Sequence, residues 1–512
     1  MLVKVYSASV QDLDAAPVTI EVNATRGTRF ALVGLPDNAV KESHERIMAA
    51  IENSGYEFPS RQITINLAPA DIRKEGSGFD LPMAIGILAT EDQVSTQHLN
   101  RYMMVGELSL DGSLQPIKGA LPIAIKAREL GYEGLFVPEE NAHEAGVVNR
   151  LKVYGVRHMN QVIGHLNGVN QLSPIEVNTR AEFYEHQTDF EFDFADVKGQ
   201  DHVKRALEIA AAGGHNLIMI GPPGSGKSML AKRLPSILPP LSLQESLETT
   251  QIHSVAGQLK AGSSLIATRP FRSPHHTISQ VALVGGGQNP QPGEISLAHN
   301  GVLFCDELPE FQRSVLEVLR QPLEDRIINI SRAKYNATYP CSFMFVASMN
   351  PCPCGYYNHP AKHCVCTPGQ ITRYLNKISG PLLDRIDLQI EVAPLSFQEL
   401  SQMAPGESSA TIRERVIRAR KIQEERFREH PGIHCNAEMG SRQMRLYAQL
   451  DDVSMEYLRD AMTKMQLSAR AYDRILRVAR TIADLAGSQD ILHEHLQEAI
   501  VYRNLDRSNW GE

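Results

Sequence analysis

The chain of 512 residues has no long apolar run and no excess of positive charge. No apolar stretch approaches the ~18 residues that a membrane-spanning helix needs, so we expect no helix that crosses a membrane. The first residues, MLVKVY, alternate like a β-strand and lack the long apolar core of a signal peptide. We find no internal repeat and no low-complexity tract. These absences predict a cytoplasmic protein without a membrane partner.

The charge balance leaves the question of a nucleic-acid partner open. The formal net charge is −8 and the isoelectric point is near 6.2, so no global basic field is present. A ring with a basic channel can nevertheless be acidic on its outside. Apolar residues make up 42% and charged residues 21%, as in an ordinary soluble protein, and the length allows two to four domains.

The pattern of elements along the chain divides it into four segments. Residues 1–170 alternate between strand-like and helix-like stretches, and 171–195 is a polar, acid-rich stretch without periodicity that we interpret as a linker. Residues 196–394 form a nucleotide module that opens with a helix over 201–212, and 395–512 is helical. The stretches that we expect to be regular are strands at 18–22 and 62–67 and helices at 41–54, 120–130, 413–428 and 469–485.

A glycine-rich loop follows the apolar run Leu217–Ile220 and has the spacing G-x-x-x-x-G-K-S. Its residues are Gly221, Pro222, Pro223, Gly224, Ser225, Gly226, Lys227 and Ser228. In a strand–loop–helix context this spacing predicts a phosphate-binding loop, because glycines let backbone N–H groups turn toward phosphate oxygens and the next helix adds its positive end. Lys227 would reach the β- and γ-phosphates of ATP, and Ser228 would hold Mg²⁺. The alternative is a chance glycine-rich turn.

Two carboxylates end a second buried-looking strand, in the run Gly301-Val-Leu-Phe-Cys-Asp306-Glu307. A buried strand rarely ends in paired acids unless they bind something. Asp306 is placed to hold Mg²⁺ through water, and Glu307 to polarise an attacking water. The alternative is a solvated acid pair at the end of a strand.

Four of the seven cysteines lie close together as C-x-C-x₉-C-x-C, within residues 351–367. They are Cys352, Cys354, Cys364 and Cys366. A tight cluster in a cytosolic chain indicates a metal more often than disulfides, and four thiolates suit a structural Zn²⁺ without an open position. Because the spacing is tighter than C-x-x-C, free thiols and an iron–sulfur cluster remain alternatives, and His359 or His363 could replace one ligand.

Further polar marks follow the phosphate loop in a fixed order. The strand-like run 343–350 ends in Asn350, the segment LLDRID carries Arg385, and LSAR at an expected helix start carries Arg470. In this order the marks resemble an AAA+ ATPase of the magnesium-chelatase branch. The segments PFRSPHHT at 270–277 and GEISLAH at 293–299 are more specific, and they resemble the chelatase-like ComM/YifB family over nearly the whole chain.

This resemblance implies a fold, an activity and roles for single residues. The fold is α/β: an AAA+ P-loop ATPase core with a helical C-terminal lid of the magnesium-chelatase type, preceded by an α+β Lon-protease-like domain (ribosomal S5 domain 2-like). Members of the family are hexameric DNA helicases linked to branch migration in natural transformation. Asn350 would be sensor 1, Arg385 an arginine finger acting on the ATP of a neighbouring subunit, and Arg470 the sensor-2 arginine. A surface ion pair is the alternative for each arginine.

The first domain resembles the proteolytic domain of Lon at 74–80 and 106–119 but lacks its catalytic pair. Gly78 stands at the position of the nucleophilic serine and Leu121 at that of the lysine, and neither side chain can perform nucleophilic catalysis. A shifted pair of Ser77 and Lys118 is an alternative. We favour a role in ring assembly or DNA contact. The charged residues Asp71, Arg73, Lys74 and Lys118 would face a channel or form an ordinary solvated face.

Two segments are candidates for sequence-independent contact with single-stranded or branched DNA. The segment 329–336, with Arg332 and Lys334, lies between apolar stretches and is expected to form a hairpin that touches phosphates. The glycine-rich stretch 283–288 can bring its backbone close to a phosphate. A plain surface hairpin is the alternative for both.

The leading hypothesis is therefore an ATP- and Mg²⁺-dependent hexameric DNA translocase or helicase with a structural zinc. Two other functions remain open. One is a chelatase motor that remodels a protein partner for metal insertion, and the other is an ATP-dependent protease.

Overall fold

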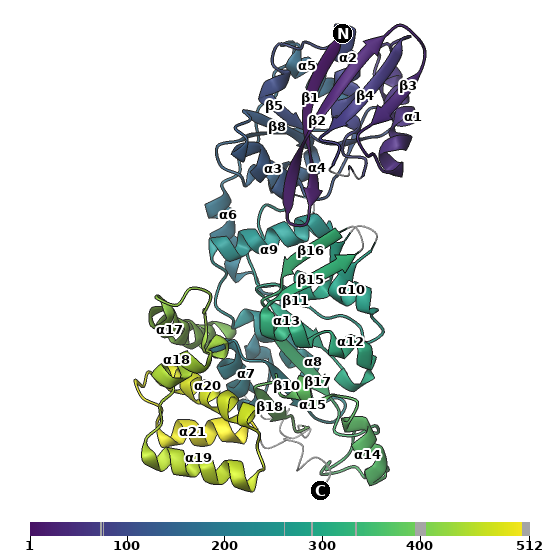
Figure 1. Cartoon of the computed structure of the whole chain (residues 1–512). Helices are drawn as coiled ribbons and strands as arrows, with labels where there is room; N and C mark the ends of the chain where they lie inside the picture. The colour runs from purple at the N-terminus through teal and green to yellow at the C-terminus, as the bar shows by residue number, and fades with distance from the viewer. Residues whose placement is uncertain are drawn as a thin grey trace. The chain divides into compact units, whose positions relative to one another are not determined.

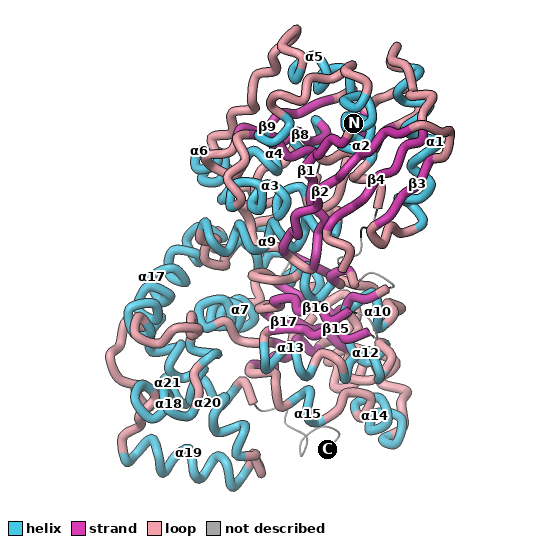
Figure 2. Tube along the Cα trace, turned by 45° about the horizontal axis from the view of Figure 1, so that its top comes forward, coloured by secondary structure: helices cyan, strands magenta, loops and turns pink. Residues whose placement is uncertain are grey.

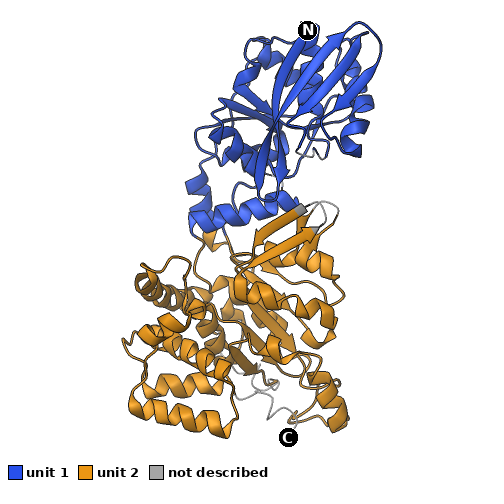
Figure 3. Ribbon diagram, viewed as in Figure 1, with its two compact units in different colours: residues 1–186, 242–267 blue, residues 187–241, 268–512 orange. Residues whose placement is uncertain are grey.

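The computed structural model describes residues 1–71, 74, 76–260, 262–287, 290–332, 335–394 and 406–503. These residues divide into two compact units, coloured separately in Figure 3. Unit 1 comprises residues 1–186 and 242–267, and unit 2 comprises residues 187–241 and 268–512. The interpretation of 171–195 as a linker stays a prediction, and a short helix lies within that stretch.

Unit 1 is built around a seven-stranded mixed sheet with the order β3-β4-β2-β1-β5-β8-β9 (Figure 1). Its elements are β1 (Leu2–Gln11), β2 (Asp14–Thr25), β3 (Phe30–Val33), α1 (Asn38–Asn53), β4 (Gln62–Ala68), α2 (Asp80–Thr90), β5 (Tyr102–Met104), β6 (Glu107–Leu108), β7 (Leu114–Gln115), α3 (Ala120–Glu129), β8 (Gly134–Pro138), α4 (Glu139–Gly146), β9 (Lys152–Val156), α5 (Met159–Leu166), α6 (Thr179–Glu185) and α9 (Leu243–Ala256).

Strands β1, β2 and β4 alternate between buried and more exposed residues, so each gives one face to a core. Helix α2 is buried along its whole length, and Gly86 lets it approach the sheet closely, because a Cβ there would lie 2.6 Å from Val22 Cγ2. Two apolar clusters fill the unit, one that includes α1, α2 and α5 and a second that includes α3 and α4.

Residues 242–267 belong to unit 1 by packing, although they lie within the range 196–394 that the sequence analysis assigns to the nucleotide module. Helix α9 starts with a capping box of Ser242 and Glu245 and packs on α3. The backbone N–H of Gly119 donates to the carbonyl of Ser254, and the Ser254 hydroxyl donates to the buried carboxylate of Glu144. This segment therefore joins the core of the first unit.

Unit 2 has a five-stranded sheet in which every pairing is parallel, with the order β11-β14-β17-β10-β18. Its elements are α7 (Asp201–Gly213), β10 (Leu217–Ile220), α8 (Lys227–Arg233), β11 (Phe271–Arg272), α10 (Gln280–Val284), β12 (Gly285–Gly286), β13 (Gln291–Pro292), α11 (Glu294–Leu297), β14 (Val302–Cys305), α12 (Arg313–Glu317), α13 (Arg320–Asp325), β15 (Ile327–Arg332), β16 (Tyr335–Pro340), β17 (Met344–Met349), α14 (Pro368–Leu375), α15 (Gly380–Leu383), β18 (Leu388–Glu391), α17 (Ser409–Phe427), α18 (Ser441–Tyr447), α19 (Asp452–Lys464), α20 (Ala469–Leu485) and α21 (His493–Val501).

The strand order brings the predicted site residues to one edge of the sheet. Strand β17, which leads to Asn350, lies between β10, which leads to the phosphate loop, and β14, which leads to Asp306. The carboxyl ends of parallel strands share an edge, so the three segments that follow them converge there. The family resemblance and this parallel α/β sheet agree.

The described C-terminal residues are helical (α17–α21, Figure 2), as the sequence predicts for 413–428 and 469–485. Serine caps begin α17 at Ser408 and α20 at Ser468. Apolar residues of α17, α20 and α21 share one cluster with α7 and the parallel sheet, so these helices extend the core of unit 2. Among the described residues, no helix combines the length and the apolar character that crossing a membrane requires.

Candidate nucleotide site and cysteine cluster

The predicted phosphate loop runs from the end of β10 to the start of α8. Gly224 and Gly226 adopt φ values of +79° and +91°, a left-handed conformation that favours glycine. Gly221 has no room for a side chain, because a Cβ there would run into the carbonyl oxygen of Val392. The glycines are thus required by the backbone path, and the N–H groups that begin α8 point into the loop.

The ammonium group of Lys227 lies inside this loop. It donates to the carbonyl oxygens of Gly221 at 2.7 Å and Pro222 at 2.9 Å, and it is 3.4 Å from Asn350 Oδ1. Burial lowers the pKa of Lys227, while the charges of Asp306 and Glu307 oppose that shift. A buried cation surrounded by oxygens is suited to exchange them for phosphate oxygens.

The end of β14 meets the start of α8 through a hydroxyl–carboxylate contact. Ser228 Oγ donates to Asp306 Oδ2 at 2.6 Å, and the hydroxyl of Ser348, on β17, donates to the other oxygen, Oδ1. Hydroxyl and carboxylate oxygens are the ligands that Mg²⁺ prefers. Ser228 and Asp306, the two predicted magnesium ligands, therefore lie side by side. Ser348 is a third participant that the sequence analysis missed.

Glu307, the residue after Asp306, has an unusual backbone conformation. Its φ is +54°, a left-handed conformation that is uncommon for a residue other than glycine and tends to occur at functional sites. Its side chain is half exposed, and one carboxylate oxygen lies 3.7 Å from His276 Nδ1. The ring of His276 is 4.1 Å from that of His275. Both histidines belong to the family-specific segment 270–277, but the sequence analysis gave them no role at Glu307.

Asn350 is fixed from two sides. Its side-chain oxygen faces Lys227, and its backbone N–H lies at the hydroxyl of Tyr374 on α14. Burial raises the pKa of Tyr374 most, and the nearby charge of Glu310 raises it further. The hydrogen bond from the Asn350 N–H lowers this pKa by less. The phenol therefore stays protonated, and Asn350 is held at the edge of the phosphate loop.

The two predicted functional arginines bind acidic side chains of their own chain. Arg385 is 8% exposed, and its guanidinium donates to Glu324 and to the carbonyl of Pro381 at 2.5 Å. Arg470 is exposed and lies 3.0 Å from Asp384. Within the described part of the chain, their hydrogen-bond partners are these groups and not the phosphate loop.

A buried ion pair, which the sequence analysis missed, ties α20 to the sheet. Arg474 Nη1 donates to Asp387 Oδ1 at 2.8 Å, and the other carboxylate oxygen accepts from the Asn216 backbone at 3.0 Å. Burial alone would raise the pKa of Asp387, but Arg474 and the buried His215 outweigh burial and hold it well below its usual range. No local motif marks such a pair, because its members are far apart in the sequence.

The four clustered cysteines converge as the sequence predicts for a metal site. Their sulfur atoms all lie within 4.8 Å of one another, and three of the separations are 3.4, 3.6 and 3.7 Å. Four ligands at about 2.3 Å around a tetrahedral Zn²⁺ would be roughly 3.8 Å apart, so the arrangement fits this ion. His359 Nδ1 accepts backbone N–H groups at 3.0 Å instead of joining the sulfurs.

The thiol of Cys354 has a lowered pKa, which favours its thiolate form. Burial would raise the pKa of Cys354, but backbone N–H groups of Tyr356 and Val365 that point at its sulfur lower it to about 6. Next to this residue, Gly355 packs on the phosphate loop, since a Cβ there would lie 2.5 Å from Pro223 Cδ. The cysteine segment is therefore a neighbour of the nucleotide site.

In unit 1, the residues that resemble the Lon nucleophile region do not form a serine–lysine pair. The hydroxyl of Ser77 donates to the carboxylate of Glu107, whereas the alkyl chain of Lys118 lies along Gly257. Leu121 is buried, and its N–H donates to Glu144 at 3.0 Å. Lys74 is buried and donates to the carbonyl of Pro69, while Arg73 lies outside the described residues.

The first predicted hairpin is present. Strands β15 and β16 pair antiparallel from Ile327 with Pro340 to Arg332 with Tyr335. Lys334 lies outside the described residues, and the side chain of Arg332 is not described. The stretch 283–288 contributes two glycines to a short ladder in which Gly285 pairs with Pro292, and its last residue, Gln288, is also outside the described part.

Comparison with known proteins accounts for most of this chain. Residues 193–400 match the family description "Magnesium chelatase, subunit ChlI", residues 20–141 match "Subunit ChlI of Mg-chelatase", and residues 406–503 match its C-terminal part. Competence protein ComM of Haemophilus influenzae is 46% identical over 508 residues, and the uncharacterized protein YifB of Escherichia coli is 44% identical over 508; each alignment covers 98% of this chain and 97% of the relative. Lon protease 2 of Bacillus subtilis is 31% identical over 157 residues, 28% of this chain and 27% of the protease.

The resemblance to ComM and YifB thus extends over nearly the full length of both partners, and the family descriptions cover the nucleotide site and the C-terminal helices. The chain belongs to the magnesium-chelatase-like ComM/YifB family.

Proposed function

We propose that this protein is an ATPase that uses Mg²⁺–ATP to move along DNA, as a hexameric translocase or helicase that promotes branch migration of recombination intermediates in natural transformation. The contact between Ser228 and Asp306 carries the ATPase part, since it joins the phosphate loop to the acidic strand. The near-full-length similarity to a relative named as a competence protein supports the part that concerns DNA.

In the proposed reaction each residue at the edge of the sheet has one task. The N–H groups of the loop and Lys227 bind the β- and γ-phosphates, and Ser228 and Asp306 hold Mg²⁺ directly or through water. Glu307 orients and polarises the attacking water, while Asn350 positions the γ-phosphate or that water. Bound Mg²⁺ neutralises charge that develops on the transferring phosphoryl group.

The remaining positive charge comes, in this proposal, from a neighbouring subunit. Arg385 would act in trans, and Arg470, on helices that would act as a lid, would act on the nucleotide of its own or the next subunit. Contacts of this head-to-tail kind close into a ring, which suits a hexamer. Since Arg385 is bound by Glu324 in the single chain, assembly has to break that ion pair and turn the guanidinium outward.

A structural zinc at Cys352, Cys354, Cys364 and Cys366 would stiffen the segment that follows Asn350. Four thiolates leave no coordination position for a substrate, so the ion would support the loop rather than take part in hydrolysis. The stiffened segment would support the phosphate loop through the contact between Gly355 and Pro223.

For the first unit we propose a Lon-like fold that has lost proteolysis and serves ring assembly or DNA contact. The partial similarity to Lon protease 2 supports the fold, and the pairing of Ser77 with Glu107 argues against an activated serine. A Lon-type protease would need a lysine amine at that hydroxyl, and the alkyl chain of Lys118 lies along Gly257 instead. We propose the following division of the chain: residues 1–170 form this domain, 171–195 the linker, 196–394 the ATPase core and 395–512 the lid.

The second candidate function is a chelatase-type motor that remodels a protein partner for metal insertion. The names of the matching family descriptions favour it, since all three refer to a magnesium-chelatase subunit. Both functions require the same ATP site, so they differ in what the motor acts on.

A strand-exchange assay separates these functions. Purified protein is mixed with a fluorescently labelled four-way junction whose arms are homologous, with Mg²⁺ and ATP or a non-hydrolysable analogue. Our proposal predicts ATP-dependent conversion into duplex products, absent with the analogue and with Lys227→Ala. Intact junctions after many ATP turnovers would contradict branch migration and favour the protein-remodelling motor.

A further inference from the structure

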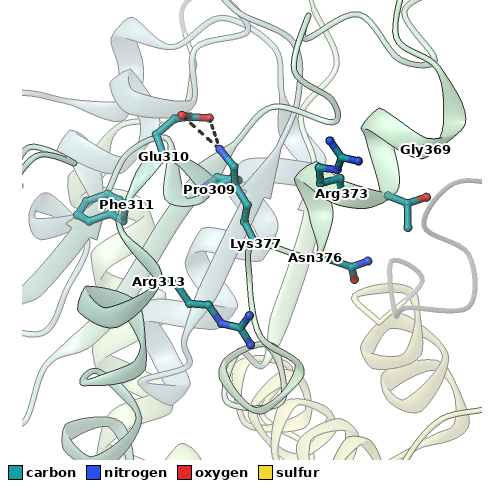
Figure 4. A pocket seen from close by; sticks show the side chains of 9 residues that line it. Pro309, Glu310, Phe311, Arg313, Gly369, Arg373, Asn376 and Lys377 are labelled. Carbon is teal, nitrogen blue, oxygen red and sulfur yellow. Dashed lines mark hydrogen bonds and ion pairs between the residues drawn. The ribbon is translucent and has the colours of Figure 1, made fainter.

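A basic pocket lies beside the nucleotide site and is not used by any of the steps above. It has a volume of about 760 Å³ and is formed between the segment 309–313, which follows Glu307, and helix α14 with the residues after it. Its charged lining residues are Glu310, Arg313, Arg373 and Lys377 (Figure 4). Three cations against one carboxylate give this pocket a positive charge on a chain whose net charge is −8.

The carboxylate is already occupied by one of the cations. Lys377 Nζ lies 3.3 Å from Glu310 Oε1 and 3.5 Å from its other oxygen, and Figure 4 joins these two residues with dashed lines. The guanidinium groups of Arg313 and Arg373 are exposed and have no such line to another residue drawn there. Arg313 does act at a distance on Glu317, whose pKa is lowered first by a hydrogen bond from Ser379 and then by Arg320.

Neutral side chains complete the lining of the pocket. Asn376, just after the helix that carries Arg373, contributes a side-chain amide, whereas the hydroxyl of Thr372 donates to the carbonyl of Pro368 at 3.0 Å. Arginine forks and amide donors are groups that proteins use for the phosphates and sugars of a nucleic-acid backbone. The side chains come from two elements and are exposed, as contact with a passing strand requires.

We propose that this pocket binds the phosphodiester backbone of a DNA strand through Arg313 and Arg373, without reading its bases. This inference rests on the proposed DNA motor and gives the motor a contact outside the hairpin β15–β16. It also places DNA close to the proposed site of ATP hydrolysis. Glu310 is three residues from Glu307, and α14 carries Tyr374, which contacts Asn350. A DNA strand in the pocket would thus touch the segment that follows Glu307 and the helix that contacts Asn350 through Tyr374.

The test is a binding titration with the full-length chain. Fluorescence anisotropy of a labelled single strand is measured at several salt concentrations, in the presence of a non-hydrolysable ATP analogue. The double variant Arg313→Gln/Arg373→Gln is compared with Arg442→Gln, which removes an exposed arginine on α18. For two lost phosphate contacts, we expect affinity to fall roughly tenfold or more and the slope of log K against log salt to shrink by about 1.4. Arg442→Gln should change neither quantity.

The outcomes distinguish this inference from the proposed function. Wild-type binding with an unchanged affinity and slope in the double variant would overturn the pocket and leave the DNA motor standing. A wild-type chain that binds no strand would overturn both. Binding of labelled poly-glutamate that is lost in the double variant, while the affinity for the DNA strand is unchanged by the same substitutions, would show that the pocket takes an acidic peptide instead. Thermal unfolding of each variant checks that the fold is intact.

Discussion

The hydroxyl of Ser228 lies 2.6 Å from Oδ2 of Asp306, although the two residues are 78 positions apart in the sequence. The contact joins the first turn of α8 to the end of β14. It exists because β10, the strand before α8, and β14 end at the same edge of a parallel sheet. The hydroxyl of Ser348 holds the other oxygen of the carboxylate, so Asp306 is oriented before any ion arrives. This preorganisation is what a Mg²⁺–ATP site needs.

The role of Arg385 in trans predicts complementation between two inactive proteins. Arg385→Ala should lower ATP turnover by roughly 10³-fold or more, as the loss of an arginine finger does. Lys227→Ala should be equally inactive. When the two are mixed in equal amounts, about a quarter of the interfaces in a mixed ring combine an intact Lys227 with an intact Arg385. Turnover should therefore reappear on mixing, in a coupled assay of phosphate release. An inactive mixture that still forms mixed rings would contradict action in trans.

Metal content tests the cysteine cluster. We expect the purified chain to carry about one Zn²⁺, because four sulfurs already converge at separations that suit its tetrahedron. Cys364→Ser should lose most of the metal, as measured by elemental analysis. Cys435→Ser is the matched control, since Cys435 is a buried thiol outside the cluster and its loss should leave the zinc in place. Iron and sulfide in place of zinc would point to an iron–sulfur cluster.

The contact of Gly355 with Pro223 predicts that the cysteine segment and ATP binding are coupled. Gly355→Ala forces a methyl group to 2.5 Å from the Pro223 ring at a φ of +82°, and we expect ATP affinity to fall by roughly tenfold. Gly432→Ala has the same backbone strain, with φ +86°, but its methyl group meets nothing within 4 Å. Titration with a fluorescent ATP analogue should therefore show weakening only for Gly355→Ala. Equal effects of both substitutions would mean that strain alone is responsible.

The buried pair of Asp387 and Arg474 predicts a pH-dependent attachment of α20. The pKa of Asp387 is below its usual range in the folded protein, so its stabilisation is fully present above the unfolded-state pKa near 4 and is lost as the pH falls below it. Asp387→Asn should destabilise unit 2 at pH 7 by about 3 kcal/mol, because it leaves Arg474 without its charged partner. Calorimetry should show a melting temperature lower by roughly 6 °C or more, a difference that narrows toward acid pH.

The control for this prediction is Glu424→Gln, which removes an exposed carboxylate from α17. It should change the melting temperature by little at any pH. An Asp387→Asn variant that melts like the wild type at pH 7 would show that the pair does not hold α20 in place.

Local patterns predicted the parts of the site that depend on neighbouring residues. The glycine spacing of 221–228 placed the loop, and the pattern of apolar residues placed strands such as β4 and helices such as α20 within a few residues. The convergence of the four cysteines was also predicted, because their spacing brings two short turns together. The family resemblance added Asn350, Arg385 and Arg470, whose roles stay proposals.

Partners that lie far apart in the sequence could not be predicted. Ser348 on Asp306, His276 beside Glu307 and Glu324 on Arg385 each depend on how strands and loops meet, and a single serine, histidine or glutamate carries no signal of that meeting. The same holds for residues 242–267. The sequence analysis placed them in the nucleotide module without predicting a helix there, and nothing local to α9 reveals that it packs on α3 of unit 1.

The most direct test of the central claim is ATP turnover by the purified chain, alone and with single-stranded, duplex or four-way-junction DNA. The account predicts Mg²⁺-dependent turnover that DNA stimulates, most strongly the junction, and that is lost in both Lys227→Ala and Ser228→Ala. Turnover that is the same with and without every DNA, in a protein that assembles and binds ATP normally, would contradict a DNA motor.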